Sequence, residues 1–225
     1  MVKLNDHIFS WSGGKDSAFA LYKLKKGGKA SPRALLTTVT KDYSRISMHG
    51  VRESLLEKQA GSLGIKLEKV YITKFAGNTE YETAMRKLLI KYSTLGVTHV
   101  VFGDIFLEDL KKYRVAKLKE AGLRGVFPLW NIDTRSLSRS FIKQGFKAVV
   151  TCADTDHIPA SFCGREYNEA FLDDLPENVD PCGENGEFHT FVYDGPNFSR
   201  PVAFKPGRKV LKNKRFLFCD LVPAN

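Results

Sequence analysis

Six consecutive residues near the start of the chain have the composition of a loop that binds polyphosphate. The segment Ser12-Gly13-Gly14-Lys15-Asp16-Ser17 follows a short apolar stretch and leads into residues with helical spacing. Paired glycines let the backbone turn sharply and bring amide N–H groups close to a ligand. A helix that starts here adds unpaired N–H donors and a partial positive charge. We therefore predict that the phosphates of a nucleotide are bound by Ser12, Gly13, Gly14, Lys15, Asp16 and Ser17.

Two other phosphate-binding loops do not fit this segment. A Walker A loop requires GxxxxGK[ST], but Phe9 stands at its first glycine and Asp16 follows its lysine. A dinucleotide-binding loop requires GxGxxG, and Gly13 and Gly14 have the wrong spacing. Asp16 could help to hold Mg²⁺ against the phosphates, or it could only cap the helix. For the whole segment, the simplest alternative is a plain glycine turn.

Further candidates lie where later strands are expected to end, because ligands of an open α/β sheet bind at the carboxyl ends of its strands. Thr38 ends the second expected strand, and Gly103 and Asp104 end the fourth. Gly103 permits close approach of the backbone, and Asp104 could accept a ribose hydroxyl, hold Mg²⁺ or only cap a helix. His49 precedes an expected helix and could contact phosphate, although a lone histidine is more often structural.

A second run with chemical potential spans residues 182–196. Its glycines predict a tight turn, and the strand that follows places Glu187 and His189 on one face. Acids and a histidine at the end of a strand suit general-base work or the binding of an ammonium group. An exposed hairpin with incidental charges is the alternative. We predict catalytic roles here for Glu184, Glu187 and His189.

Strands and helices alternate through the first two thirds of the chain, and this order would position the candidate residues. Helical spacing, with a glycine after most segments, predicts helices between the strands. The alternation implies βαβ units, a mostly parallel sheet and helices on both faces. We predict a doubly wound, Rossmann-like α/β domain over residues 1–152 and a smaller α+β part over residues 153–225. Apolar runs predict strands at residues 7–11, 34–39, 67–72, 97–102, 126–130 and 146–152.

Composition indicates a folded protein and disfavours several classes. The chain has 225 residues, of which 43% are hydrophobic and 27% are charged. No apolar run approaches the roughly 18 residues that a membrane helix needs, and no secretory signal is visible. Four widely spaced cysteines fit reduced thiols better than a disulfide framework or a zinc finger. We therefore expect a cytoplasmic protein without a membrane partner.

Much of the net charge of +10 is concentrated near the end of the chain. Residues 200–215 contain seven basic residues and no acid. A solvated basic hairpin is the favoured interpretation, and a surface for nucleic acid or for an acidic partner is the alternative.

The pattern S-G-G-x-D-[ST] at residues 12–17 resembles the signature of the PP-loop ATP pyrophosphatases. That resemblance implies a fold of the adenine nucleotide alpha hydrolase type, with ATP and Mg²⁺ as cofactors. With G-E-N-G-E-F-H-T-F-V-Y-D-G-P at residues 183–196, the chain resembles the diphthine–ammonia ligase family over roughly residues 7–198. Residues 103–105, 128–130 and 141–148 also fit that family.

The resemblance implies that AMP is transferred from ATP to a carboxylate and that ammonia then converts the carboxylate into an amide. In that family the acceptor is diphthine, a modified histidine of translation elongation factor 2. Lys15 and Mg²⁺ would neutralise the departing pyrophosphate, and Thr38 would lie near the adenine. Glu184, Glu187 or His189 would bind the ammonium group and accept its proton.

The second motif departs from the archaeal and eukaryotic members at two positions. Asn185 replaces a glycine, and His189 stands where an acid would be. The chain thus resembles a bacterial-type branch, and bacteria do not make diphthamide. The acceptor could therefore be a different protein or a small molecule, and a homodimer is compatible with the sequence.

Two other functions would share the predicted phosphate loop. A sulfur transferase that modifies tRNA would depend on cysteines, so replacing Cys152, Cys163 and Cys182 by serine would stop it and would leave an amide ligase active. A non-catalytic adenine nucleotide-binding protein would bind ATP without releasing AMP and pyrophosphate.

Overall fold

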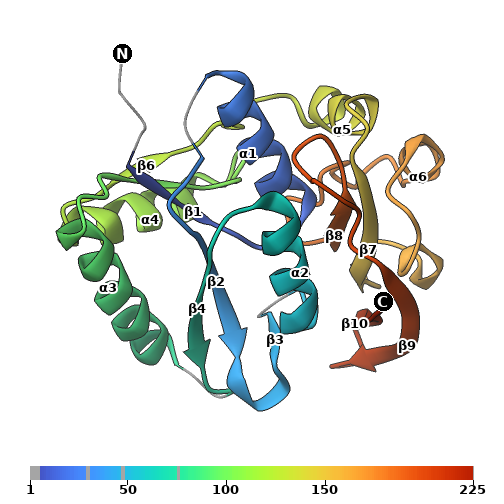
Figure 1. Cartoon of the computed structure of the whole chain (residues 1–225). Helices are drawn as coiled ribbons and strands as arrows, with labels where there is room; N and C mark the ends of the chain where they lie inside the picture. Colours follow the sequence, from blue (N-terminus) through green and yellow to red (C-terminus); the bar gives the residue numbers. More distant parts are fainter. Residues whose placement is uncertain (1–5, 29–30, 47–48, 75–76, 225) are drawn as a thin grey trace.

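The first sheet of the protein has the strand order of a Rossmann-like fold (Figure 1). The computed structural model describes residues 6–28, 31–46, 49–74 and 77–224. Parallel strands follow the spatial order β4-β2-β1-β5-β6, and β3 (Arg45–Ile46) pairs antiparallel with the end of β2. The predicted α/β architecture with a mostly parallel sheet is confirmed. The parallel strands are β1 (His7–Ser10), β2 (Leu35–Thr40), β4 (Leu67–Ile72), β5 (His99–Val101) and β6 (Arg124–Val126).

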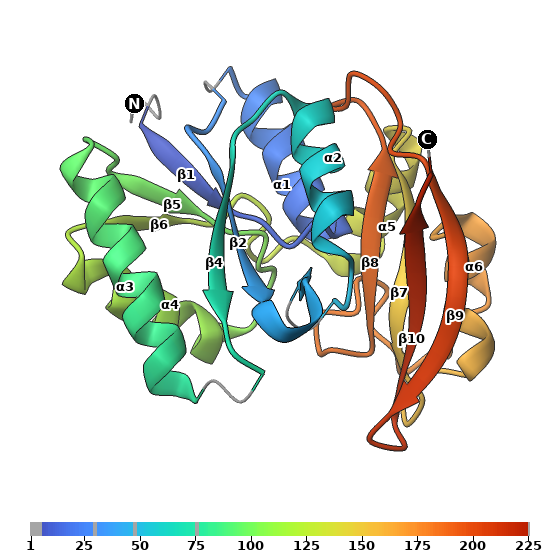
Figure 2. The ribbon, with the colours of Figure 1, turned by 60° about the horizontal axis from the view of Figure 1, so that its bottom comes forward.

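Helices cover both faces of this sheet, as Figure 2 shows. Helices α1 (Lys15–Lys26) and α2 (Glu53–Leu63) lie on one face, and α3 (Asn78–Thr94) and α4 (Glu108–Glu120) lie on the other. Successive residues of a strand point to opposite faces, so Phe9 packs in the core of α1 and α2, whereas Ile8 packs beneath α3 and α4.

The C-terminal part forms a separate antiparallel sheet with the order β8-β7-β10-β9. The strand that we expected in the parallel sheet at residues 146–152 is β7, which lies in this second sheet, so that expectation was wrong. Almost all of β7 is buried, and a strand covered on both faces has the continuous apolar sequence typical of a parallel sheet. The four strands are β7 (Lys147–Asp154), β8 (Phe188–Asp194), β9 (Phe204–Lys212) and β10 (Phe216–Pro223).

Helices α1 and α2 are packed between the two sheets (Figure 2). Phe19 of α1 contacts Phe141 and Phe146, with ring centroids 5.9 and 5.8 Å apart. Phe141 belongs to α5 (Thr134–Lys143), and the short α6 (Glu169–Asp173) packs on the second sheet. Within the described ranges, no helix is long and apolar enough to cross a membrane.

Candidate functional site

The predicted phosphate loop, residues 12–17, connects β1 to α1 in a conformation that requires glycine. Gly13 has a φ of +78°, and a Cβ added there would lie 2.6 Å from Leu56 Cδ1. Gly14 caps the amino end of α1. A Cβ on Gly103 would lie 2.8 Å from backbone atoms of Asp16 and Ser17, so the end of β5 touches the first turn of the helix. The glycines thus let the loop pack closely enough to direct the amino end of α1 into a cavity.

The second sheet and helix α2 hold the loop in place through residues that sequence reasoning missed. Thr190 Oγ1 of β8 accepts a hydrogen bond from Lys15 N at 3.1 Å, and Val192 N donates to Gly13 O at 2.9 Å. Buried Gln59 of α2 donates to the same Gly13 carbonyl and to Val192 O, and its Oε1 accepts from Trp11 Nε1 at 2.7 Å. The only sequence signal was a glutamine within the apolar stripe of α2.

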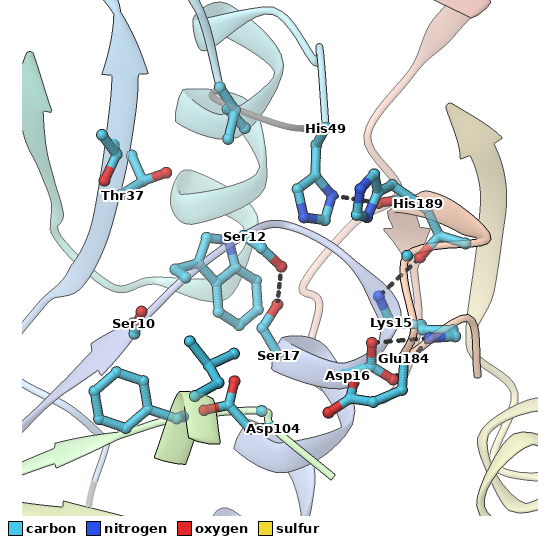
Figure 3. Close-up of a pocket in the computed structure, with 18 of the residues that line it drawn as sticks. Ser10, Ser12, Lys15, Asp16, Ser17, Thr37, His49, Asp104, Glu184 and His189 are labelled. Atoms are coloured by element: carbon cyan, nitrogen blue, oxygen red, sulfur yellow. Dashed lines mark hydrogen bonds and ion pairs between the residues drawn. The ribbon is translucent and has the colours of Figure 1, made fainter. Parts of the chain in front are cut away.

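A cavity of about 470 Å³ opens in front of the loop and is lined by both parts of the chain (Figure 3). Glu187 does not line it, and Gly13 and Gly14 shape the loop rather than the wall. Gly183 and Thr190 join the wall from the C-terminal part. The cavity brings together most of the predicted site residues, namely Ser12, Lys15, Asp16, Ser17, Thr38, His49, Gly103, Asp104, Glu184 and His189.

The Lys15 ammonium is buried between the phosphate loop and the C-terminal part. Its Nζ donates to both oxygens of Asp16 at 2.8 Å and to the carbonyl of Cys182. Burial has the largest single effect and lowers the pKa of Lys15, but the Asp16 carboxylate together with Cys182 and Glu184 outweighs it, so the pKa is raised. Lys15 is therefore a fixed positive charge beside the cavity.

Glu184 projects into the cavity from the loop before β8 and faces the end of β5. Its Oε1 accepts a hydrogen bond from Ile105 N at 2.7 Å. Burial raises the pKa of Glu184 to about 7, although the Ile105 N–H opposes the shift. A carboxylate with this pKa exchanges a proton readily near neutral pH.

Glu187 supports the same loop from the protein interior. Its Oε1 accepts from Asp180 N at 3.1 Å and from Asn185 Nδ2 at 3.0 Å. Asp180 in turn accepts from Glu184 N at 2.8 Å. Glu187 is 3% exposed and is thus placed to shape the loop that carries Glu184.

His49 and His189 form a close pair of rings at the cavity wall (Figure 3), with centroids 4.5 Å apart. Burial lowers the pKa of His189 to about 4, and Lys15 adds to the shift. Burial, and then the neighbouring His189, also lowers the pKa of His49 well below its usual value. Both imidazoles are therefore neutral at pH 7 in the structure.

Two carboxylates of the cavity, Asp16 and Asp104, suit a divalent cation. Oxygen ligands are those that Mg²⁺ prefers, and Mg²⁺ is usually held by one or two carboxylates together with substrate phosphates and water. Asp104 forms an ion pair with Arg114 at 2.7 Å, and burial raises its pKa against the effect of that arginine. The two carboxylates match the oxygen ligands of a magnesium ion that also binds phosphate, and the ion would share them with Lys15 and Arg114.

The carboxyl end of β2 offers a polar group for the base or sugar of a nucleotide. Thr37 lines the cavity beside Thr38, and its Oγ1 is buried without a hydrogen-bond partner among the described residues. A buried hydroxyl without a partner is costly, so a ligand that bonds it gains affinity. Thr38, the residue predicted for this position, also lines the cavity, but Thr37 carries the open polar atom.

Two known domain families match most of the chain. Residues 6–125 match the diphthamide synthase N-terminal domain, and residues 133–220 match the diphthamide synthase C-terminal domain. A crystal structure described as a predicted subunit of tRNA methyltransferase from Methanocaldococcus jannaschii is similar at 20% identity and a TM-score of 0.46. That similarity covers 65% of this chain and 80% of the other. None of the curated proteins matches the chain.

Proposed function

Because the chain belongs to the diphthamide synthase family, we propose that it is an ATP-dependent ligase that converts a carboxylate into an amide. The observation that carries this proposal is the shared cavity, in which the phosphate loop of the first part faces Glu184 of the second. A substrate in this cavity would contact both the loop that binds phosphate and the carboxylate that transfers a proton. The acceptor is a carboxylate, either diphthine on elongation factor 2 or a carboxylate of another protein or small molecule.

The first step of the proposed reaction activates the carboxylate. An oxygen of the acceptor attacks the α-phosphorus of ATP, the bond between the α-phosphorus and the bridging oxygen breaks, and pyrophosphate leaves. The first turn of α1 and the hydroxyls of Ser12 and Ser17 bind the outer phosphates, and Lys15 stabilises their negative charge. A bound Mg²⁺, held by Asp16 and Asp104, would neutralise further charge on the pyrophosphate.

The second step forms the amide. The nitrogen of ammonia attacks the acyl carbon, the bond from that carbon to the AMP oxygen breaks, and AMP leaves. Glu184 takes the proton that the nitrogen loses, and its pKa of about 7 suits this task near neutral pH. His49 and His189, both neutral and with their rings tilted by 34° to each other, line the wall beside the phosphates, and Glu187 holds the Glu184 loop.

The state of the cysteines favours amide formation over sulfur transfer. All four cysteines are buried and unpaired. Burial raises the pKa of both Cys152 and Cys163 to about 12, and it also raises the pKa of Cys182 and Cys219. The thiolate is the nucleophilic form, and these sites disfavour it.

Labelled ATP tests the proposed reaction. The protein is incubated with Mg²⁺, ammonium and ATP labelled at the α- or γ-phosphate, together with diphthine-bearing elongation factor 2 or with a metabolite extract. We expect labelled AMP and labelled pyrophosphate only when an acceptor is present. Glu184→Gln should lower turnover by about 10²- to 10⁴-fold while ATP still binds. Glu177→Gln, at an exposed position of the same C-terminal part, is the matched control.

Three outcomes would contradict the proposal. Release of ADP and orthophosphate would exclude cleavage between the α- and β-phosphates. ATP binding without turnover in the presence of every acceptor would instead support a nucleotide-binding protein. Loss of turnover on replacing cysteines alone would support sulfur transfer.

A further inference from the structure

The hairpin formed by β9 and β10 carries positive charge that the fold does not neutralise. Arg215 forms an ion pair with Asp154, in which Nε lies 2.7 Å from Oδ1. The other basic side chains of the hairpin form no ion pair within the described ranges, and all of them are exposed; they are Lys205, Arg208, Lys209, Lys212 and Lys214. Because these charges form no ion pairs with the residues that the structure describes, they do not stabilise the fold and are available to a binding partner.

The strand β9 is also an open edge, because it lies at the end of the second sheet. Val210 is 48% exposed and Leu211 is 54% exposed, so neither side chain contributes to a core. Lysines and a proline on an edge strand discourage pairing with another strand, and Pro206 and four lysines occupy or follow this edge. A second copy of the chain, with the same charge, is therefore a poor partner for it.

The hairpin is connected to the first part of the chain by ion pairs. Asp220 of β10 forms ion pairs with Arg45 and Arg52, at 2.8 and 2.6 Å. Val210 lies opposite Phe218 in the antiparallel register, and Lys212 Nζ lies 5.2 Å from the Phe218 ring. The positive face of β9 is thus fixed in position relative to the segment that follows β2.

An exposed aromatic ring lies where the two parts meet. Tyr43 is 46% exposed, and Lys212 Nζ and Lys74 Nζ lie over its ring, 5.3 and 5.4 Å from the ring centroid. Proteins that bind single-stranded nucleic acid combine a basic track for the phosphates with aromatic rings on which bases stack. An acidic peptide would use the charges but would have no need of the ring.

We infer that Tyr43, the adjacent face of the hairpin with Arg208, Val210 and Lys212, and Lys214 in the turn that follows bind single-stranded nucleic acid. The cations contact the phosphate backbone, and a base stacks on Tyr43 in place of an ammonium group that moves from the ring to a phosphate. This inference does not depend on the proposed ligase activity. Of the two interpretations of residues 200–215, it favours the binding surface over the solvated hairpin.

Fluorescence anisotropy with a labelled single-stranded RNA of 20 nucleotides and mixed sequence tests the inference. The variant Arg208→Gln/Lys212→Gln/Lys214→Gln removes three phosphate contacts. Each contact on a single strand contributes about 0.7 to the slope of log affinity against log salt. We therefore expect the slope to fall by about 2 and the affinity at 0.1 M salt to fall about 100-fold relative to the wild-type protein.

A matched variant controls for net charge. Lys87→Gln/Lys119→Gln/Lys143→Gln removes three exposed cations from helices of the first part and from α5, and it should weaken binding less than threefold. Tyr43→Leu should weaken binding about 5- to 100-fold by loss of one stacked base. Tyr113→Leu, at an exposed tyrosine on α4, should leave binding unchanged.

The inference is overturned if the hairpin variant and the control variant lose the same affinity, because the binding would then follow net charge alone. It is also overturned if polyglutamate of matched charge binds as tightly as RNA with no effect of Tyr43→Leu, which would identify an acidic protein as the partner. Thermal melting of each variant confirms that the protein remains folded, and ATP binding should be the same in all of them.

Discussion

The substitution Glu184→Gln should stabilise the protein at alkaline pH even though it removes the proposed base. The pKa of Glu184 is raised from 4.5 to about 7 by burial, so the folded protein binds more protons than the unfolded chain between these values. The free energy of unfolding therefore falls as the pH rises through this window and stays low above it. At 1.36 kcal/mol per pH unit, the raised pKa lowers the free energy of unfolding by about 3 kcal/mol at pH 8.5 and by about 1 kcal/mol at pH 5.5, relative to pH values below 4.5. Glutamine keeps the acceptor oxygen for Ile105 N and removes this cost.

Differential scanning calorimetry of the protein without nucleotide measures the effect. A gain of about 3 kcal/mol in a chain of this size should raise Tm by about 6 to 12 °C at pH 8.5, and the gain should be about a third as large at pH 5.5. Glu177→Gln serves as the control and should show no such dependence on pH. If Glu184→Gln were no more stable than the wild-type protein at pH 8.5, the carboxylate would be solvated rather than buried, and its proposed role as a base near neutral pH would lose its physical basis.

Three further substitutions test other parts of the site. Gly103→Ala places a Cβ 2.8 Å from the backbone of the phosphate loop. It should lower the free energy of unfolding by about 1–3 kcal/mol in urea denaturation and weaken ATP binding at least tenfold in calorimetric titration. Gly61→Ala, in open space on α2, is the control and should be neutral or stabilising. Thr190→Val leaves Lys15 N without its acceptor, so the free energy of unfolding should fall by about 1–2 kcal/mol in the same denaturation assay, and ATP binding should weaken. Unchanged values would show that β8 does not hold the loop. Cys182→Ala should keep turnover of labelled ATP within about threefold, and its complete loss would favour thiol chemistry.

The mostly parallel sheet and the phosphate loop could be predicted because local sequence carries them. The loop needs no distant partner to be recognisable: paired glycines between a strand and a helix are required by backbone geometry at that point, as Gly13 shows with its φ of +78°. The spacing of apolar residues likewise indicates whether a helix or strand is buried on one face or on both. That information was enough for the fold class, but not for the sheet to which a fully buried strand belongs.

The role of β7 illustrates the limit. Its apolar sequence is the same whether it lies in a parallel sheet or between two antiparallel neighbours, because burial on both faces is common to the two arrangements. Pairing is decided by long-range contacts with β8 and β10, which follow it by tens of residues. Sequence periodicity contains no information about those partners.

The same division applies to the site. Sequence alone determined which residue types gather around the cavity in front of the phosphate loop, since the carboxyl ends of parallel strands meet at one edge of a sheet. Only the tertiary structure separated Glu184, which faces the cavity, from Glu187, which is buried beneath the loop, and only it brought Gln59 and Thr190 to the phosphate loop from α2 and β8. The physical reason is that hydrogen-bond partners and burial depend on elements distant in the chain, whereas backbone conformation and periodicity depend on neighbours.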